Sequence, residues 1–345
     1  MSDDRTKRTP PERLPLAALT GFLGSGKTTV LRHLLKQPAM ANTAVIINEF
    51  GEIGLDDALV ETADEDVVTM ASGCLCCTIR SDLANTLHDL FLRRRRGDVA
   101  PFERVIVETT GLADPAPILH TLMTEPLVAA RFRLDAVVAT VDAANGAATL
   151  DAHAESVKQA AVADRLLLTK TDLADAAALE ARLRALNPAA PLIRVAHGAV
   201  DPDRLFGAGL YNPATKSVDV ARWLNEAAYA DDHAHHHDVN RHDDRIRAYC
   251  LSHDRPIAWA ALADWLEALT SMRGPDLLRL KGVVHVSDTN GPVVLHAVQH
   301  IFHPPVVVED WPDDDRRTRL VFITRDMPKD AVQKMFRAFV EQSEA

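Results

Sequence analysis

A glycine-rich segment near the start of the chain constrains the fold more than any other stretch. Residues 21–28 read Gly-Phe-Leu-Gly-Ser-Gly-Lys-Thr, which fits the pattern G-x-x-x-x-G-K-[ST]. A short apolar run, Leu14–Leu19, precedes the segment, and Lys27–Lys36 then carries apolar residues at helical spacing. The pattern predicts a buried strand, a tight glycine turn and a helix, which is how a parallel α/β sheet of this kind begins.

The same segment has the chemistry of a phosphate-binding loop. Glycines let backbone N–H groups turn inward around phosphate oxygens, and the helix that follows points its positive end at the same anion. Lys27 should reach the β- and γ-phosphates of a nucleotide, and the Thr28 hydroxyl should bind Mg²⁺. The predicted nucleotide-binding residues of the loop are Gly21, Gly24, Ser25, Gly26, Lys27, Thr28 and Thr29.

Short apolar runs alternate with helical stretches over the following part of the chain. The runs are nearly continuous in apolar residues, as parallel strands covered on both faces are, and lie at Ala44–Ile47, Arg104–Val107, Ala136–Val141 and Arg165–Leu168. Helical spacing predicts helices at Asp82–Leu92, Glu155–Ala163 and Leu173–Leu186. The fold class is therefore α/β, with a P-loop NTPase parallel sheet and flanking helices.

One of these strands ends in a carboxylate that suits magnesium chemistry. Glu108 follows three apolar residues and precedes Thr-Thr-Gly111. A carboxylate at a strand end can hold Mg²⁺ directly or through water, and the Gly111 N–H can donate to a γ-phosphate. Many phosphate-loop proteins carry aspartate where this chain has glutamate. We predict Lys27 and Glu108 as catalytic residues, and Thr28 with Glu108 as the magnesium site.

The end of the Arg165–Leu168 strand carries a candidate base-recognition segment. Residues 169–172 read Thr-Lys-Thr-Asp, which is close to the guanine signature N-K-x-D with threonine in place of asparagine. An aspartate carboxylate can accept two hydrogen bonds from the N1 and N2 groups of guanine, a donor pair that adenine lacks. We therefore expect Thr169, Lys170 and Asp172 to select a guanine nucleotide.

The sequence pattern changes after about residue 225. A polar stretch contains His233, His235, His236 and His237, and it predicts a linker. Neighbouring strand candidates with few helices then predict a smaller α+β domain, with strands at 245–251, 282–286, 293–299 and 320–324 and helices at 256–269 and 329–340. The predicted organisation is a disordered tail (1–13), a P-loop GTPase domain (14–225), a His-rich linker (226–244) and a C-terminal domain (245–345).

Composition argues against nucleic acid and membranes as partners. The formal net charge is −11, whereas nucleic-acid phosphates require a basic face. The run Arg93–Arg96 beside Gly97 is better explained as a solvated helix end. No stretch resembles a membrane span, and residues 1–13 lack the apolar core of a signal peptide. We expect a cytoplasmic protein.

Three of the four cysteines are clustered in Gly73-Cys-Leu-Cys-Cys77. Clustered thiols in an intracellular protein indicate metal or redox chemistry rather than a structural disulfide. Cys74, Cys76 and Cys77 can supply three thiolates, whereas zinc normally takes four ligands, so one position stays open for Glu49, a histidine, water or a recipient protein. Ser72 and Gly73 predict that the cluster lies in a loop. The alternatives are binding through two thiolates and redox sensing.

Glu49 and the histidine run are further metal candidates. Glu49 lies directly after the Ala44–Ile47 strand, where a nucleotide-sensing switch loop is expected. It can contact Mg²⁺ or the thiol-bound metal, take part in catalysis, or remain a solvated loop acid. The imidazoles between residues 233 and 237 can bind zinc, nickel or cobalt weakly, or simply reflect linker composition. Scattered histidines such as His197 are expected at the surface or satisfied in the core.

Together these segments resemble the CobW-type GTPases, which include the zinc-regulated GTPase metalloprotein activators. The resemblance rests on residues 21–28, 48–51, 73–77, 108–111 with 113–115, and 169–172, and extends to 278–282 and 321–325. It implies a SIMIBI-class P-loop GTPase domain followed by a CobW C-terminal domain. It also implies slow GTP hydrolysis, with GTP/GDP, Mg²⁺ and Zn²⁺ as ligands, and delivery of the metal from the Cys-x-Cys-Cys motif to a client metalloprotein.

The expected function is therefore GTP-dependent zinc transfer to a client, in a protein that can also form a homo-oligomer. The alternatives are a cobalt (Co²⁺) chaperone for cobalamin synthesis or nitrile hydratase, a small-molecule kinase, and a redox-responsive nucleotide-binding module. We identify no residue that positions the attacking water. No glutamine follows Gly111 closely, which leaves Glu49 and Asp114 as candidates.

Overall fold

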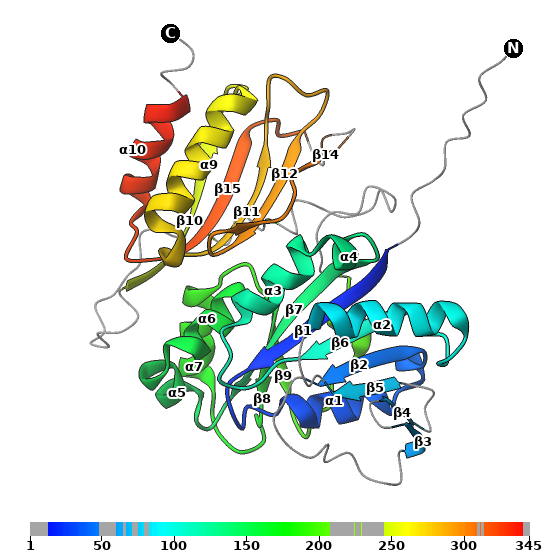
Figure 1. The fold of residues 1–345 in the computed structure, drawn as a ribbon. Helices are drawn as coiled ribbons and strands as arrows, with labels where there is room; N and C mark the ends of the chain where they lie inside the picture. Colours follow the sequence, from blue (N-terminus) through cyan, green and yellow to red (C-terminus); the bar gives the residue numbers. More distant parts are fainter. Residues whose placement is uncertain are drawn as a thin grey trace, which may run out of the picture.

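Two sheets divide the chain into two domains, as Figure 1 shows. The computed structural model describes residues 13–47, 83–207, 245–308 and 314–340, with residues 224, 229 and 311. It also describes the backbone of 60–64, 67–70 and 75–78. Glu49, Cys74 and the histidine run at 233–237 lie outside the described residues, so the predictions made for them stay predictions.

The N-terminal sheet has nine strands in the order β3-β4-β5-β2-β6-β1-β7-β8-β9. Neighbouring strands from β5 to β9 pair in parallel, and β3 and β4 extend one edge with antiparallel pairing. This confirms the predicted parallel α/β sheet. The strands are β1 (Leu14–Gly21), β2 (Thr43–Ile47), β3 (Val60–Asp64), β4 (Val67–Met70), β5 (Leu75–Thr78), β6 (Arg104–Glu108), β7 (Phe132–Asp142), β8 (Arg165–Thr169) and β9 (Leu192–Val195).

Helices cover both faces of this sheet. They are α1 (Lys27–Leu35), α2 (Leu83–Arg96), α3 (Pro115–Thr124), α4 (Pro126–Ala129), α5 (Gly146–Ala152), α6 (Ala154–Val162) and α7 (Ala177–Leu186). Along β1, Leu16 and Ala18 join the core beneath α2 and α3, whereas Ala17 and Leu19 join the core beneath α1. A strand buried on both sides needs a continuous apolar run, which is why the sequence pattern identified it.

The domain contains elements that were not predicted, among them β9 and α5, and two further differences have a clear physical reason. The last helix begins at Ala177 rather than Leu173, because residues 170–176 form a loop in which Lys170 has a φ of +56° and the Leu173 N–H donates to the Lys170 carbonyl at 2.9 Å. Helix α3 was not predicted. It begins with Pro115, and the Asp114 side chain caps it by accepting the Ala116 N–H, so two prolines near its start obscured the helical pattern.

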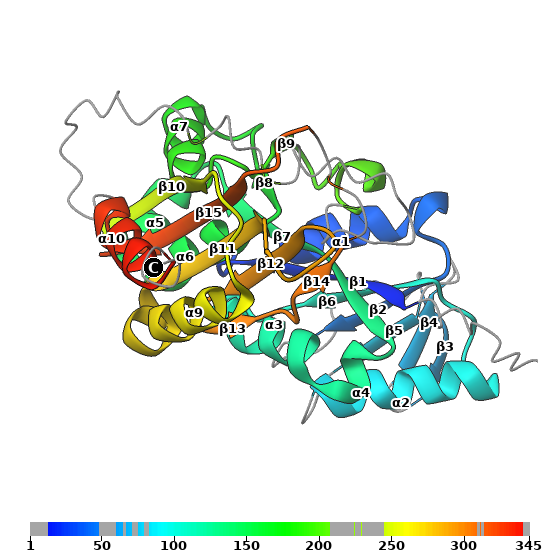
Figure 2. The ribbon, with the colours of Figure 1, turned by 90° about the horizontal axis from the view of Figure 1, so that it is seen from above.

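The C-terminal sheet has six strands in the order β10-β15-β11-β12-β13, with β14 paired to β12. All its pairings are antiparallel. Helices α9 (Trp259–Arg273) and α10 (Lys329–Val340) lie side by side over one face (Figures 1 and 2). This confirms the α+β domain. The strands are β10 (Ile246–His253), β11 (Leu277–Val284), β12 (Val293–Val298), β13 (Ile301–Phe302), β14 (Val306–Val307) and β15 (Thr318–Arg325).

The predicted start of α9 at Pro256 is wrong by three residues. Ile257 instead forms an isolated parallel bridge with Val286, and its N–H donates to the His285 carbonyl at 2.8 Å. The Asp288 carboxylate accepts the Trp259 N–H at 3.1 Å, which places the first helical turn after this bridge. A tertiary pairing therefore overrides the helical preference of the sequence here.

The two domains meet along α6 and β11. Arg279 and Lys281 of β11 form ion pairs with Asp164, which follows α6, and all three residues are buried. A second contact joins Gln299, after β12, to Asp114 of the loop before α3, with Nε2 to Oδ2 at 3.0 Å. The loop that follows Glu108 is therefore in direct contact with the C-terminal domain.

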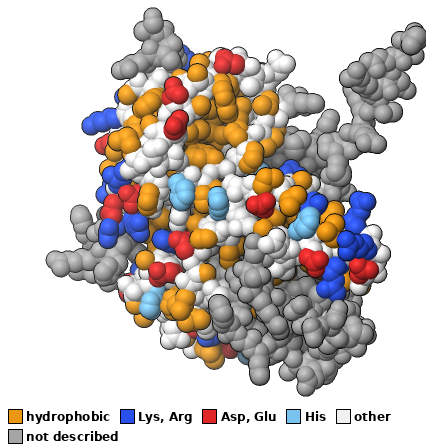
Figure 3. Space-filling model, in the orientation of Figure 1, with side chains coloured by type: hydrophobic (Ala, Val, Ile, Leu, Met, Phe, Trp, Pro, Cys, Tyr) orange, Lys and Arg blue, Asp and Glu red, His pale blue; other side chains and the backbone are white. Residues whose placement is uncertain are grey.

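A basic cluster lies at the end of α2. Arg93, Arg94, Arg95 and Arg96 form the last turn of that helix, at the right of Figure 3, and Gly97 follows with a φ of +81°. Arg94 Nε donates to the Phe102 carbonyl at 2.7 Å. This agrees with the prediction of a helix end, where cations interact favourably with the helix dipole. Among the helices of the described residues, none is long and apolar enough to cross a membrane.

Candidate functional site

The predicted nucleotide-binding segments meet at the carboxyl edge of the N-terminal sheet. In the register of neighbouring strands, Leu19 of β1 pairs with Glu108 of β6, and Gly21 pairs with Thr140 of β7. Asp142 pairs with Thr169 of β8. Open parallel sheets bind ligands outside this edge, because the loops that follow adjacent strands converge there.

Close packing dictates the conformation of the phosphate loop. Gly21 has a φ of +141°, and a Cβ at this position would lie 2.2 Å from Thr140 Oγ1 and 2.5 Å from the Thr140 carbonyl oxygen. Only glycine fits such a position. Lys27 is buried at the start of α1, and its Nζ donates to the carbonyl oxygens of Gly21 at 2.9 Å and Phe22 at 3.3 Å. The ammonium group is thus held over the first residues of the loop.

The two residues predicted to bind magnesium lie together. Thr28 Oγ1 donates to Glu108 Oε1 at 3.0 Å, although the residues are 80 positions apart in the sequence. Glu108 is only 1% exposed. This pair puts a hydroxyl and a carboxylate, both oxygen donors that Mg²⁺ prefers, beside the lysine of the phosphate loop.

The loop after Glu108 packs closely against the phosphate loop. A Cβ on Gly111 would lie 2.7 Å from the Leu23 backbone nitrogen and 2.9 Å from its Cα, so a larger residue would push the two loops apart. Gln159 of α6 donates from Nε2 to the carbonyl oxygens of Gly111 and Ala113. Gln159 was not among the predicted site residues, because a lone glutamine on a helix gives no signal of this contact.

Asp114 anchors the same loop. It accepts the Ala116 N–H at 3.0 Å, Lys158 Nζ at 2.6 Å and the Gln299 amide. Burial opposes ionisation, but these donors together hold the pKa of Asp114 below its ordinary value. The carboxylate is therefore charged and engaged in structural contacts, which fits an anchoring role better than a role in orienting water.

The threonine that replaces asparagine in the base-recognition segment joins that segment to the phosphate loop. Thr169 is buried, and its Oγ1 lies 2.6 Å from the Ser25 carbonyl oxygen and 3.2 Å from that of Val141. Lys170 Nζ donates to Asp142 Oδ2 at 2.7 Å. Burial raises the pKa of Asp142, but the hydrogen bonds from Lys170, Asn145 and the Ala144 N–H outweigh it and lower the pKa.

His197 lies beside the predicted guanine-binding carboxylate. It follows β9 with a φ of +51°, and its Nδ1 is 3.8 Å from Asp172 Oδ2. The side chain is exposed, as predicted, but its place beside Asp172 was missed. Gly198 packs against α1, because a Cβ there would meet the Thr29 carbonyl oxygen at 2.7 Å. Strand β9 was not predicted from the sequence. Its carboxyl end brings His197 and Gly198 to the site, so their position could not be predicted either.

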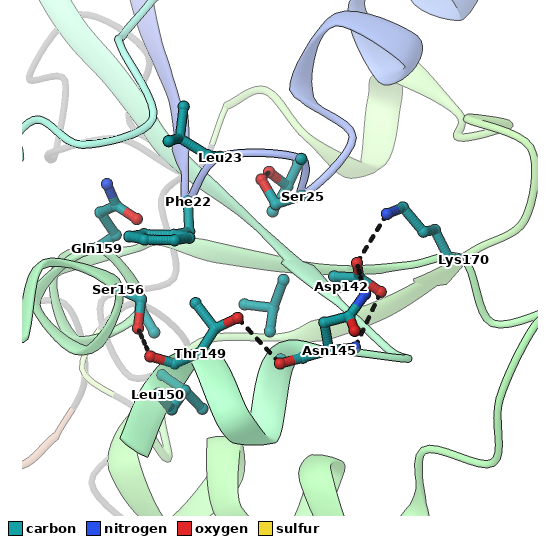
Figure 4. Close-up of a pocket in the computed structure, with 15 residues that line it drawn as sticks. Phe22, Leu23, Ser25, Asp142, Asn145, Thr149, Leu150, Ser156, Gln159 and Lys170 are labelled. Atoms are coloured by element: carbon teal, nitrogen blue, oxygen red, sulfur yellow. Dashed lines mark hydrogen bonds and ion pairs between the residues drawn. The ribbon is translucent and has the colours of Figure 1, made fainter. Parts of the chain in front are cut away.

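A cavity of about 240 Å³ lies between the phosphate loop and helices α5 and α6 (Figure 4). Phe22, Leu23, Gly24 and Ser25 form one wall. Asp142 and Lys170 line it on the side of β7 and β8, and α5 and α6 contribute Leu150 and Gln159 among others. The phosphate loop, the base-recognition segment and α6 therefore line one cavity.

Two of the clustered cysteines lie in a strand, so the predicted loop is wrong for them. Cys76 and Cys77 belong to β5, where they pair with Val45 and Ile46 of β2. No group of three or more potential metal ligands occurs within the described residues.

Comparisons with known proteins place both domains. Residues 15–194 match the CobW/HypB/UreG nucleotide-binding domain, and residues 246–340 match the cobalamin synthesis protein CobW C-terminal domain. The zinc chaperone YjiA of Escherichia coli is 31% identical over 94% of this chain and 98% of its own length. The zinc chaperone CobW of Pseudomonas aeruginosa is 30% identical over 94% of this chain and 91% of its own length. The crystal structure of Zn(II)-bound YjiA GTPase from E. coli covers 95% of this chain and 99% of that chain, at 30% identity and a TM-score of 0.75.

Proposed function

Because this chain belongs to the CobW/HypB/UreG family of GTPases, we propose that it hydrolyses GTP and uses the cycle to deliver zinc to a client metalloprotein. The observation that carries the nucleotide part is the meeting of Lys27, the Thr28–Glu108 pair and Thr169 at one edge of the sheet. The names of the relatives support the zinc part. We propose boundaries of 14–225 for the GTPase domain and 245–345 for the C-terminal domain, which contain the matched residues 15–194 and 246–340.

Magnesium is the expected partner of the phosphates. Thr28 and Glu108 fit it, because two oxygen donors lie 3.0 Å apart beside the phosphate loop. The ion would neutralise charge on the β- and γ-phosphates. Lys27 supplies a further positive charge there, Gly111 supplies an N–H, and Thr169 holds the base-recognition segment against the loop.

We expect Thr28→Ala to weaken the magnesium dependence of GTP hydrolysis. Loss of even an outer-shell partner of a metal site costs roughly 10- to 100-fold in affinity or activity, and a direct ligand should cost at least as much. The measurement is the Mg²⁺ concentration for half-maximal hydrolysis. Thr28→Ser keeps the hydroxyl and should retain the wild-type value. Equal values for the alanine and serine variants would remove Thr28 from the magnesium site.

Zinc is the proposed cargo, held by the thiolates of Cys74, Cys76 and Cys77. The strand that contains Cys76 and Cys77 pairs with β2, and β2 pairs with β6, which ends at Glu108. A change around Glu108 can therefore reach the cysteine segment through adjacent backbone. Thermodynamic linkage makes the coupling reciprocal: if GTP tightens zinc binding, zinc tightens GTP binding by the same factor.

We expect Cys76→Ser to weaken zinc binding by roughly 100-fold, since a complete zinc site contributes about 10–16 kcal/mol shared among four ligands. Wild-type zinc affinity should differ by about 5- to 150-fold between a non-hydrolysable GTP analogue and GDP. Zinc titration of each nucleotide state measures both effects, and Co²⁺ titrated in parallel tests the alternative cargo.

Cys250→Ser is the matched control, because Cys250 lies in β10 of the other domain. It should bind zinc like the wild type. Unchanged affinity in Cys76→Ser would move the zinc site elsewhere, with the histidines as the first candidates. Equal affinity with the analogue and with GDP would contradict the nucleotide-driven cycle.

A further inference from the structure

Gln159 is a buried amide that binds the loop after Glu108. The residue is 1% exposed and lies on the face of α6 that meets the phosphate loop. Its Nε2 donates to the Gly111 carbonyl oxygen at 3.2 Å and to the Ala113 carbonyl oxygen at 3.0 Å. A single amide group therefore uses both of its protons on one short segment of backbone.

The orientation of this amide follows from its partners. If nitrogen and oxygen were exchanged, Oε1 would face two carbonyl oxygens, neither of which can donate a hydrogen bond. Oε1 therefore points away from the Gly111–Ala113 segment. It lies on the side of the cavity, where Gln159 is next to Phe22 (Figure 4).

The outward oxygen lacks a donor within the described part of the chain, although it is buried. A buried amide oxygen without a donor is destabilising. The adjoining cavity of about 240 Å³ has room for water, and its lining includes Leu23, Gly24 and Ser25 of the phosphate loop. Gln159 thus binds the Gly111–Ala113 segment directly and lines the same cavity as the phosphate loop.

We infer that Gln159 is a positioning residue for GTP hydrolysis. Its NH₂ group holds the Gly111–Ala113 segment against the phosphate loop, beside the cavity that the same loop lines. The inference rests on the proposed GTPase function, in which the Gly111 N–H contacts the γ-phosphate. GDP lacks this phosphate, so loss of the Gln159 contacts should affect the GTP state and spare the GDP state.

The test compares wild type with Gln159→Leu and Gln159→Glu in single-turnover GTP hydrolysis, and in binding of a non-hydrolysable GTP analogue and of GDP. Leucine removes both hydrogen bonds at similar volume, and we expect hydrolysis to slow by roughly 10- to 100-fold, as for two neutral hydrogen bonds. Analogue affinity should fall and GDP affinity should stay at the wild-type value. GDP binding also verifies that each variant is folded.

Gln159→Glu adds a pH readout. The ionised carboxylate would face two carbonyl oxygens, whereas the protonated form regains one O–H donor. Burial raises a carboxyl pKa, so the deficit in analogue affinity relative to wild type should shrink as the pH falls from about 8 to about 6. A pH-independent deficit would contradict the assigned hydrogen bonds.

Ser156→Ala is the matched control. Ser156 lines the same cavity from the same helix, but its hydroxyl donates to the carbonyl oxygens of Thr149 or His153 rather than to the loop. Wild-type hydrolysis in Gln159→Leu, or equal losses of analogue and GDP affinity, would overturn the inference. A wild-type protein that binds the analogue without hydrolysing GTP would contradict the proposed function instead, and the analogue-to-GDP affinity ratio would still decide the role of Gln159.

Discussion

Replacing Asp172 with asparagine should lower GTP affinity by about 100- to 10,000-fold, because each charge-assisted hydrogen bond contributes about 1.5–3 kcal/mol. The carboxylate can accept from both N1 and N2 of guanine. The asparagine amide accepts only through its oxygen, and its NH₂ group would face a second donor of the base. Titration with a fluorescent GTP analogue measures the loss.

The structure explains why Asp172 should carry this discrimination. Thr169 fixes the start of the segment to the phosphate loop through the Ser25 carbonyl oxygen, at 2.6 Å. Lys170, with a φ of +56°, turns the chain outward and is itself held by Asp142. Asp172 therefore follows a segment that is anchored to the predicted phosphate site, and His197 lies next to it.

Xanthine nucleotides provide a gain-of-binding test of the same prediction. Xanthine carries a carbonyl oxygen where guanine carries the N2 amino group, so the acceptor and donor of asparagine match it. Asp172→Asn should therefore bind the xanthine nucleotide more tightly than wild type does. Asp175→Asn is the matched control, because Asp175 lies in the same loop and its carboxylate accepts the Ala177 N–H at 3.1 Å. A specificity unchanged in Asp172→Asn would place base recognition elsewhere.

Asp164→Asn should destabilise the protein by about 3–5 kcal/mol, because it leaves buried cations without their carboxylate. Asp164 Oδ1 accepts from Arg279 and, at 2.8 Å, from Lys281 Nζ, while Oδ2 accepts the Val137 N–H at 2.9 Å. Arg279 also donates to the carbonyl oxygen of Ala163 at 2.6 Å. One carboxylate thus joins β7, β8 and β11 across the boundary between the domains. Urea unfolding measures the loss.

Asp164, Arg279, Lys281 and His296 form a buried cluster, and its charges shift the pKa values of Asp164, Lys281 and His296. Burial opposes ionisation of Asp164, yet Arg279 and Lys281 hold its pKa far below the ordinary value. Burial and the charge of Arg279 lower the pKa of Lys281 to about 8, because they outweigh the attraction of Asp164. Burial and the same two cations keep the pKa of His296 well below its ordinary value. At neutral pH the cluster therefore contains one anion, two cations and a neutral imidazole.

The pH dependence of Asp164→Asn gives a second readout. In wild type the pKa of Lys281 is about 8 in the folded protein, against an ordinary value of 10.5 in the unfolded chain. The unfolded chain therefore binds more protons between these pH values, and the free energy of unfolding rises with pH there. In Asp164→Asn the carboxylate no longer stabilises the charged lysine, so the pKa of Lys281 in the folded variant falls further. The free energy of unfolding of the variant therefore begins to rise at a lower pH than that of wild type. The deficit of the variant should therefore shrink as the pH rises toward about 8.

The exposed ion pair of Arg245 and Asp326 is the control for this prediction. Both side chains are more than a third exposed, so Asp326→Asn should have a far smaller effect on unfolding. A small effect of Asp164→Asn, or a deficit that does not change with pH, would show that the buried cluster does not govern the stability of the domain boundary.

Local patterns allowed much of the fold and part of the site to be predicted. The apolar runs that became β1, β2, β6, β7 and β8 are continuous because each strand is buried on both faces. The glycines and Lys27 of the phosphate loop act within a few residues of one another, so their spacing alone is informative. Helix α3 and the start of α9 were missed, because prolines and a tertiary bridge governed them.

The sequence by itself determined the candidate binding groups: the glycine loop with Lys27 and Thr28, the carboxylates Glu108 and Asp172, and the clustered cysteines. Only the tertiary structure decided how these groups are positioned. Thr169 reaches Ser25 across 144 positions, Arg279 reaches Asp164 across 115, and Gln159 reaches Gly111 across 48. Such contacts depend on the order of strands in the sheet and on the packing of α6 and β11, which residue spacing along the chain does not encode.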